Sequence, residues 1–169
     1  MLKIVAIASA AALSALGAAK AVVVLDAHAQ KPAPSVMTLT APEPAATGGV
    51  ASVMKADDGH FWADATVNGT AVHFLVDTGA SAVALSAEDA ERLGLQPASL
   101  TYDYTVNTAS GQARAAKVKL ATVSVSGAEV DGVDAFVIDK GLQTSLLGMT
   151  YRGRLSKFEA TQDSLILRP

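Results

Sequence analysis

The chain has 169 residues, of which 50% are apolar and only 5% aromatic, and its formal net charge at pH 7 is −3. This length suits one folded domain, and a weakly acidic chain without a basic run gives no reason to expect a nucleic-acid partner. Because the sequence contains no cysteine, a disulfide framework and a thiolate metal site are both excluded.

The first 29 residues have the features of a leader segment. Lys3 makes the start positive, residues 4–19 are free of charge, and Ala27-His28-Ala29 matches the A-x-A pattern that signal peptidase cuts. Residues 1–29 are therefore interpreted as a signal peptide cleaved near Ala29 or as an uncleaved anchor in the cytoplasmic membrane. Both interpretations predict a periplasmic or otherwise extracytoplasmic domain, and the remaining alternative is an ordinary core helix.

The next segment has the composition of a linker. Residues 30–50 contain four of the six prolines, together with Ala, Thr and a Gly-Gly pair, and such a stretch cannot build a core. We therefore expect a disordered linker rich in Pro and Ala over residues 30–56. A single folded domain is expected over residues 57–169.

The first part of this domain carries clear hairpin and helix signals. Strands are predicted over residues 61–67 and 70–76, joined by Asn68-Gly69, which is a strong type I′ turn signal. Ser86-Ala-Glu-Asp89 resembles a capping box and predicts a helix start, and Gly94 is placed to end that helix.

Turn residues divide the rest of the domain into further strands. Ser110-Gly111, Gly127 and Gly141 separate apolar stretches, and residues 146–155 are predicted as a short helix. The strands predicted here cover residues 102–108, 112–120, 121–126, 130–138 and 164–168. The sum is an all-β, antiparallel fold with about seven strands and one or two short helices.

One carboxylate is notable because it ends the most apolar of these strands. Residues 70–76 run directly into Asp77-Thr78-Gly79-Ala80-Ser81, and a carboxylate in such a place is unfavourable unless another group or a reaction uses it. An isolated Asp-Thr-Gly would also suit an ordinary turn. Here, however, a second element, Leu146-Leu147-Gly148, follows later in the chain.

Together, the flanked Asp-Thr-Gly and the Leu-Leu-Gly element resemble the retropepsin-like aspartic proteases, in particular their small bacterial, membrane-tethered or periplasmic group. The resemblance covers residues 57–169 and implies a single-lobe, closed β-barrel that hydrolyses peptide bonds of polypeptide substrates. It implies that Asp77 is catalytic and is supported by Thr78, Gly79 and Ala80, with Leu146, Leu147 and Gly148 as the second signature element. The flap implied over the substrate consists of Thr108, Ala109, Ser110 and Gly111.

Hydrolysis by carboxylates needs two of them. One, ionised, takes a proton from water, and the other, protonated, polarises the scissile carbonyl group. The sequence holds one Asp-Thr-Gly and no internal repeat, so the second carboxylate would come from a second copy of the chain. We therefore expect an aspartic endopeptidase that acts as a homodimer, with a two-fold axis between the two Asp77 side chains and with no metal or organic cofactor.

Alternatives from other classes stay open. With a weak dimer or a flap that does not close, the same fold would be a non-catalytic dimerisation or peptide-binding module. A lipid- or wall-associated β-domain is compatible with the leader alone. A metal centre is disfavoured because His60 and His73 lie on different predicted strands without an acidic third ligand, and the context of Ser81 and Ser86 lacks the G-x-S-x-G pattern of serine hydrolases.

Two positions depart from the resembling enzymes. Arg152-Gly153 interrupts what is usually an apolar helix, and an interior glycine costs roughly 1 kcal/mol, which puts the helix over residues 146–155 in question. Ala80 stands where pepsin-type enzymes carry a hydroxyl that donates to the catalytic carboxylates. Without that donor a carboxyl pair holds its shared proton to higher pH, so we expect a mildly acidic to near-neutral pH optimum.

Overall fold

The computed structural model describes residues 45–109 and 111–169. The predicted leader over residues 1–29, residues 30–44 of the predicted linker, and Ser110 lie outside the described residues. Within them, no helix is long and apolar enough to cross a membrane. The strands are β1 (Thr47–Gly48), β2 (Ala51–Met54), β3 (Trp62–Val67), β4 (Thr70–Val76), β5 (Val83–Leu85), β6 (Tyr104–Thr108), β7 (Gly111–Val125), β8 (Ala128–Ile138), β9 (Leu146–Leu147), β10 (Lys157–Ala160) and β11 (Ser164–Arg168). The helices are α2 (Ala87–Arg92), the 3-10 helix η2 (Pro97–Ser99) and α3 (Met149–Arg152).

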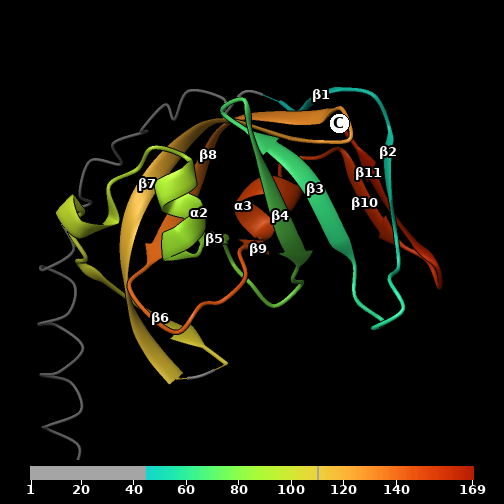
Figure 1. The fold of residues 1–169 in the computed structure, drawn as a ribbon. Helices are drawn as coiled ribbons and strands as arrows, with labels where there is room; N and C mark the ends of the chain where they lie inside the picture. The colour runs from blue at the N-terminus through green and yellow to red at the C-terminus, as the bar shows by residue number, and fades with distance from the viewer. Residues whose placement is uncertain (1–44, 110) are drawn as a thin grey trace, which may run out of the picture. The chain divides into compact units, whose positions relative to one another are not determined.

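Six strands form a closed circuit, which makes this part of the chain a β-barrel (Figure 1). In the order β8–β5–β9–β4–β3–β7 each strand pairs with the next, and β7 pairs in turn with β8. β6 extends the sheet from β7, and β1 extends it from β8. The predicted all-β fold, a closed barrel with two short α-helices, is therefore confirmed.

Two of the pairings are parallel, although the sequence pattern indicated an antiparallel fold. β4 pairs with β9 and β5 pairs with β8 in parallel register. Parallel neighbours require long connections, and such connections leave no local turn signal in the sequence. As a consequence the carboxyl ends of β4 and β9 lie side by side, and each of them leads into one of the two signature elements.

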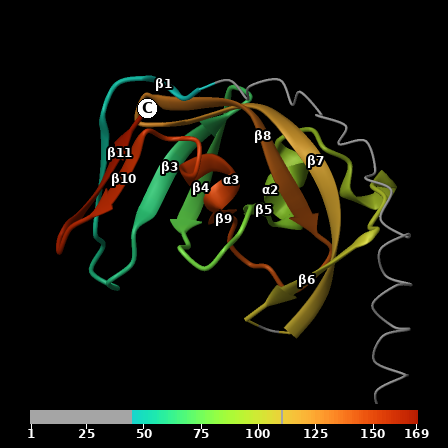
Figure 2. The ribbon, with the colours of Figure 1, turned by 180° about the vertical axis from the view of Figure 1, so that it is seen from behind.

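The barrel is filled by aliphatic and aromatic side chains, and α3 packs against β5 and β8. Views from opposite sides show α3 between β8 and the pair β3–β4 (Figure 1 and Figure 2). Its Tyr151 is fully buried and donates a hydrogen bond to the main-chain oxygen of Ala128 at 2.8 Å. The largest buried side chains are Tyr151, Phe74, Leu85, Leu120, Leu147, Leu165 and Leu167.

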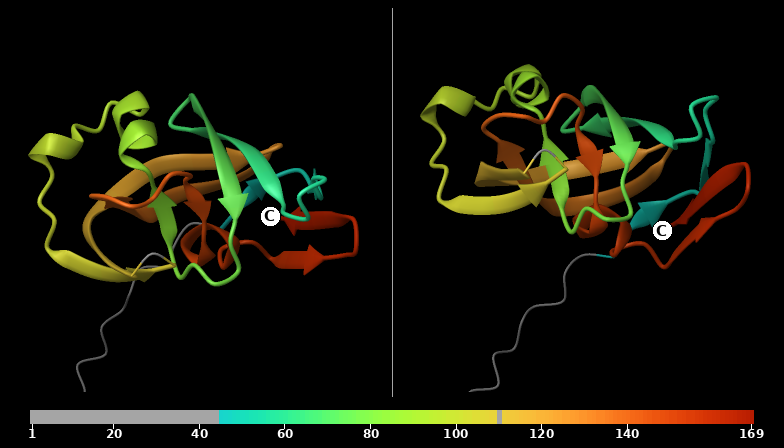
Figure 3. Two further views of the ribbon diagram at one scale, coloured as in Figure 1. Left: turned by 60° about the horizontal axis from the view of Figure 1, so that its bottom comes forward. Right: turned by 90° about the horizontal axis from the view of Figure 1, so that it is seen from below.

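A separate three-stranded sheet joins β2 to the C-terminal strands. β11 pairs antiparallel with both β10 and β2, and the hairpin of β10 and β11 projects on the side away from α2 (Figure 3). This finding corrects the linker expected over residues 30–56, because residues 47–48 and 51–54 are strands of the domain. Ala51 and Val53 are buried in alternation with exposed neighbours, a pattern too short to recognise until the C-terminal partner strand is known.

Several elements differ in extent from their prediction. The segments 112–120 and 121–126 form one strand, β7, because β8 pairs with it along most of its length. Residues 146–155 begin as the strand β9 rather than as a helix, and only α3 remains helical, with Gly153 as its C-cap. Pairing with β4 and β5 overrides the local helical pattern. The short strands β5 and β10 were not predicted.

Candidate active site

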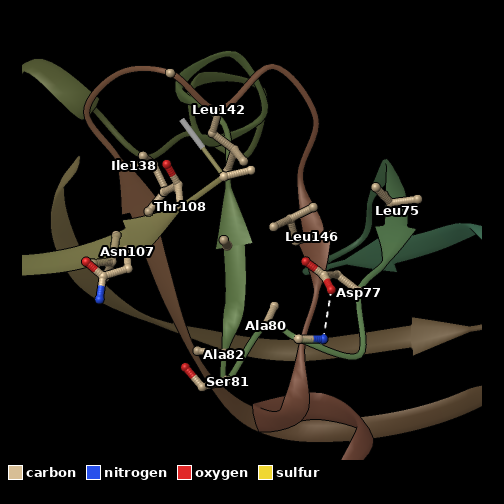
Figure 4. Close-up of a pocket in the computed structure, with 15 residues that line it drawn as sticks. Leu75, Asp77, Ala80, Ser81, Ala82, Asn107, Thr108, Ile138, Leu142 and Leu146 are labelled. Atoms are coloured by element: carbon tan, nitrogen blue, oxygen red, sulfur yellow. Dashed lines mark hydrogen bonds between the residues drawn. The ribbon is translucent and has the colours of Figure 1, made fainter. Parts of the chain in front are cut away.

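Asp77 is the first residue beyond β4, where the barrel strand opens into a loop. Its side chain is partly buried, and the Gly79 backbone N–H donates to Asp77 Oδ1 at 2.8 Å (Figure 4). A Cβ atom at Gly79 would approach that oxygen to 3.3 Å, a tight contact that glycine avoids. The loop thus holds one carboxylate oxygen by a main-chain donor at a fixed place.

The Leu-Leu-Gly element lies directly beside this loop. Leu146 pairs with Leu75 in the parallel register of β9 and β4, so the chain reaches Gly148 next to the residues that follow Asp77. The Met149 N–H donates to the main-chain oxygen of Ala80 at 3.0 Å. This hydrogen bond and the strand pairing join the two halves of the signature.

A buried hydrogen-bond network fixes the start of β9. Ser145 is fully buried, its hydroxyl donates to the carboxylate of Asp89, and it accepts a hydrogen bond from the Ser86 N–H at 3.0 Å. Asp89 also pairs with Arg92. The main-chain oxygen of Ser145 accepts from Leu75 N–H at 2.9 Å, so α2, β4 and β9 are connected through one serine.

Arg152, the last residue of α3, is a site residue that sequence analysis noted only as a departure from the family pattern. It is 3% exposed, and its Nη2 donates to the main-chain oxygen of Asp77 at 2.7 Å. Burial lowers the pKa of the Arg152 guanidinium, and the charge of Asp77 raises it. No sequence signal pointed to this contact, because it depends on α3 ending after a single turn.

Asp77 lines a cavity of about 490 Å³. Apolar side chains of Leu75, Ile138, Leu142 and Leu146 form much of its wall. Figure 4 shows Asp77 on one side of this cavity and Thr108 on the other. A carboxylate therefore faces a largely apolar space.

The predicted flap residues lie on the β6–β7 hairpin. Thr108, the last residue of β6, pairs with Gly111, and its hydroxyl donates to the Gly111 main-chain oxygen at 2.8 Å. Thr108 and Ala109 line the cavity, whereas Gly111 does not. Ser110, also predicted for the flap, lies outside the described residues.

The other predicted site residues divide between the cavity and its support. Gly79, Ala80 and Leu146 line the cavity with Asp77. The remaining predicted residues do not line it: Thr78 is exposed, Leu147 is buried in the core, and Gly148 packs against the main chain of Ala82.

The two histidines of the described residues, His60 and His73, pair with aspartates rather than with each other. His73 Nδ1 lies 2.6 Å from Asp64 Oδ1 and its ring stacks on Trp62 with centroids 5.0 Å apart, and His60 lies near Asp58. Over residues 45–109 and 111–169, no group of three or more His, Cys, Asp or Glu side chains is placed to hold a metal ion.

Comparison with known proteins identifies the family. The model of the family described as "gag-polyprotein putative aspartyl protease" matches residues 63–153. A crystal structure of a retropepsin-like aspartic protease from Rickettsia conorii is 39% identical, with a TM-score of 0.65, and the match covers 72% of this chain and 100% of that chain. The chain belongs to the retropepsin-like aspartyl protease family.

Two curated relatives of this retropepsin-like chain are uncharacterized. A protein in the cobV 5′ region of Sinorhizobium sp is 46% identical over 112 residues, which cover 66% of this chain and 48% of the relative. The protein RP867 of Rickettsia prowazekii (strain Madrid E) is 41% identical over 115 residues, which cover 68% of this chain and 49% of the relative. The chain spans about half the length of both relatives.

Proposed function

We propose that this retropepsin-like protein is an aspartic endopeptidase that acts on polypeptide substrates as a homodimer. The observation that carries the proposal is Asp77, a carboxylate held by the Gly79 amide at the edge of a largely apolar cavity. An extended peptide would lie in that cavity between the Asp77 loop and the β6–β7 hairpin. Family membership supports the same reaction class.

The second carboxylate would come from a second copy of the chain. Thr78 and Gly79 are exposed in the protomer, so this edge of the loop is accessible to the same loop of a partner. A two-fold contact there would bring the two Asp77 carboxyls together. Two carboxyls in contact cannot both ionise, and the pair would share one proton.

The chemistry follows from this shared proton. The ionised carboxylate takes a proton from a water molecule as the water oxygen bonds to the scissile carbonyl carbon, and the protonated carboxyl gives its proton to the carbonyl oxygen. In the tetrahedral intermediate the protonated carboxyl gives its proton to the amide nitrogen, and the other carboxylate takes a proton from one hydroxyl group of the intermediate. The C–N bond then breaks, the amine and the acid leave, and the pair again holds one proton. Thr108 and Ala109, at the hairpin tip, would cover the bound peptide and exclude water.

A peptide-library digest tests the proposal. The chain should cleave peptides, and Asp77→Asn, which keeps the size of the side chain but removes the acid, should abolish cleavage while the circular dichroism spectrum is unchanged. Cleavage that persists in Asp77→Asn would assign the activity to a contaminant. A folded parent dimer that cleaves nothing would favour the non-catalytic, peptide-binding module.

An extracytoplasmic location is a further part of the proposal, supported by the leader-like residues 1–29. Fusion after Val50 of a reporter that works only outside the cytoplasm should give signal. Mass spectrometry of the N-terminus would then distinguish cleavage near Ala29 from a retained anchor in the cytoplasmic membrane. Signal from a cytoplasm-only reporter alone would contradict the location.

A further inference from the structure

A buried cation lies beside Asp77, and no step of the proposed chemistry uses it. The Arg152 guanidinium donates to the main-chain oxygen of Asp77 and stacks over Phe158, with its Cζ 4.7 Å from the ring centroid. Its Nε is buried without a hydrogen-bond partner among the described residues. Burial of a charged group with an unpaired N–H is unfavourable, and an apolar side chain would fill this site without that penalty.

The helix that carries Arg152 is fixed against the Asp77 loop. Besides the Met149 hydrogen bond to Ala80, the Thr150 hydroxyl accepts from the Val83 N–H at 2.9 Å. At the end of α3 a Cβ on Gly153 would approach the Met149 main-chain oxygen to 2.8 Å. These contacts therefore hold the Arg152 guanidinium at a fixed position relative to Asp77.

Several charged groups on the neighbouring elements pair with one another, and β8 also carries Glu129 and Asp131. On β10, Lys157 and Glu159 flank Phe158 and pair with each other at 2.7 Å, with exposed side chains. On β8, Asp134 is held by Lys117 Nζ at 2.8 Å and by a second lysine of β7. β5 carries no charged residue.

Among the described residues, Asp77 is the charged group that acts on the pKa of Arg152. Burial lowers the pKa of the guanidinium, and the negative charge of Asp77 opposes that effect. Attraction between two charges is mutual. A positive charge beside a carboxylate favours its ionised form, and the hydrogen bond to the main-chain oxygen places the Arg152 charge beside this residue.

We propose that Arg152 is a positioning residue of the Asp77 site, whose guanidinium fixes the Asp77 main chain and whose charge favours the ionised carboxyl. Its role in catalysis rests on the proposed function. In a homodimer, two such guanidinium charges would flank a carboxyl pair that shares one proton. They would stabilise the anion from the main-chain side, where Ala80 offers no hydroxyl donor.

Three substitutions in the full chain separate charge from packing. Arg152→Met removes the charge and the donors, Arg152→Gln keeps a donor without the charge, and Arg152→Lys keeps the charge. Arg154→Gln is the matched control, because this neighbouring arginine donates to the main-chain oxygen of Asp131 at 3.1 Å. The measurements are the pH profile of kcat/KM on one peptide and a ¹³C NMR titration of the Asp77 carboxyl.

In Arg152→Met and Arg152→Gln, the acidic limb of the profile and the NMR midpoint should both move to higher pH by about one unit. Arg152→Lys should restore most of the parent behaviour, and Arg154→Gln should not shift. If Arg152→Met does not fold, Arg152→Gln decides. Variants that lose stability or activity while the limb and the midpoint stay at the parent pH would show a purely structural arginine and overturn the proposal.

The NMR titration does not depend on turnover, so the two proposals fail separately. A parent that cleaves no peptide, but whose Asp77 midpoint moves in Arg152→Gln, would refute the endopeptidase and support the charge effect of Arg152. A parent with Asp77-dependent cleavage and no shift in either readout would support the endopeptidase and refute this inference.

Discussion

The main chains at Gly148 and Ala82 are in direct contact, because a Cβ atom on Gly148 would overlap the main-chain oxygen of Ala82. This contact sits where β9 turns into α3 and where the Asp77 loop turns into β5. The glycine of the second signature element therefore has a physical reason: any side chain at this position would prevent α3 from approaching the Asp77 loop so closely.

Gly148→Ala should consequently destabilise the domain. The added methyl group meets main-chain atoms that cannot rotate away, so we expect the free energy of unfolding to fall by about 3 kcal/mol. Urea denaturation measures the change. Gly49→Ala is the control, since a Cβ there would meet nothing within 4 Å, and an unchanged midpoint in Gly148→Ala would contradict the close contact.

Ser145→Ala should also destabilise the domain, through polar groups left without partners. The change removes the acceptor of the Ser86 N–H and a donor to Asp89, both in buried surroundings. We expect a loss of about 2 kcal/mol in the free energy of unfolding. Ser99→Ala, which removes an exposed hydroxyl, should change it little, and equal effects of the two substitutions would argue against the network.

The buried phenol of Tyr151 should make the domain less stable at alkaline pH. Burial raises the pKa of Tyr151 well above its ordinary value of 10.0, so above that pH the unfolded chain releases a proton that the folded chain keeps. The contribution of Tyr151 to the free energy of unfolding is therefore complete below pH 10. Above pH 10 this contribution falls by about 1.4 kcal/mol per pH unit.

Tyr151→Phe isolates this contribution. At pH 7 the variant should be less stable by about 1 kcal/mol, because the Ala128 oxygen loses its donor. At pH 11 that difference should vanish or reverse, as the variant has no phenol to ionise. Urea titrations at both pH values give the difference, with the exposed Tyr104→Phe as control. A constant difference between the two pH values would mean that Tyr151 ionises alike in both states.

Dimer dependence is the most direct test of the proposed active unit. Since each chain supplies one Asp77, specific activity should fall on dilution through the dimer dissociation constant, in step with the mass measured by analytical ultracentrifugation. Mixing parent with excess Asp77→Asn should suppress activity, because heterodimers hold one acid. Constant activity per chain in a monomeric solution would rule out the shared site.

The sequence was sufficient for the parts of the fold that depend on local signals. Asn68 and Gly69 both have positive φ, as the I′ turn requires, and Ser86 caps α2 by accepting from the Asp89 N–H. The Asp-Thr-Gly and Leu-Leu-Gly elements were likewise recognisable, and the structure places them side by side through β4 and β9.

What the sequence did not predict depends on partners that are distant in the chain. β9 is a strand only because β4 and β5 lie on either side of it, and β2 is a strand because β11 does. The contact of Arg152 with Asp77 spans 75 positions and requires α3 to stop at Gly153. A local pattern contains no information about any of these.

The last prediction concerns Ala80, which lines the cavity together with Asp77 (Figure 4). Ala80→Ser places a hydroxyl directly after Gly79, where it would donate to the carboxyl pair. A donor favours the ionised form, so the acidic limb of the kcat/KM profile should move to lower pH by about one unit. The parent, which lacks the donor, should work best at mildly acidic to near-neutral pH.

Ala82→Ser is the matched control, because it adds the same hydroxyl to the same cavity farther along the loop. Its acidic limb should stay at the parent position. The double variant Ala80→Ser with Arg152→Gln tests whether charge and hydrogen bonding act on the same carboxyl. Because one substitution adds a stabilising contact to the anion and the other removes one, the two opposing shifts of the acidic limb should largely cancel. A parent optimum at strongly acidic pH, or an Ala80→Ser profile that coincides with the parent, would show that position 80 does not govern the protonation of Asp77.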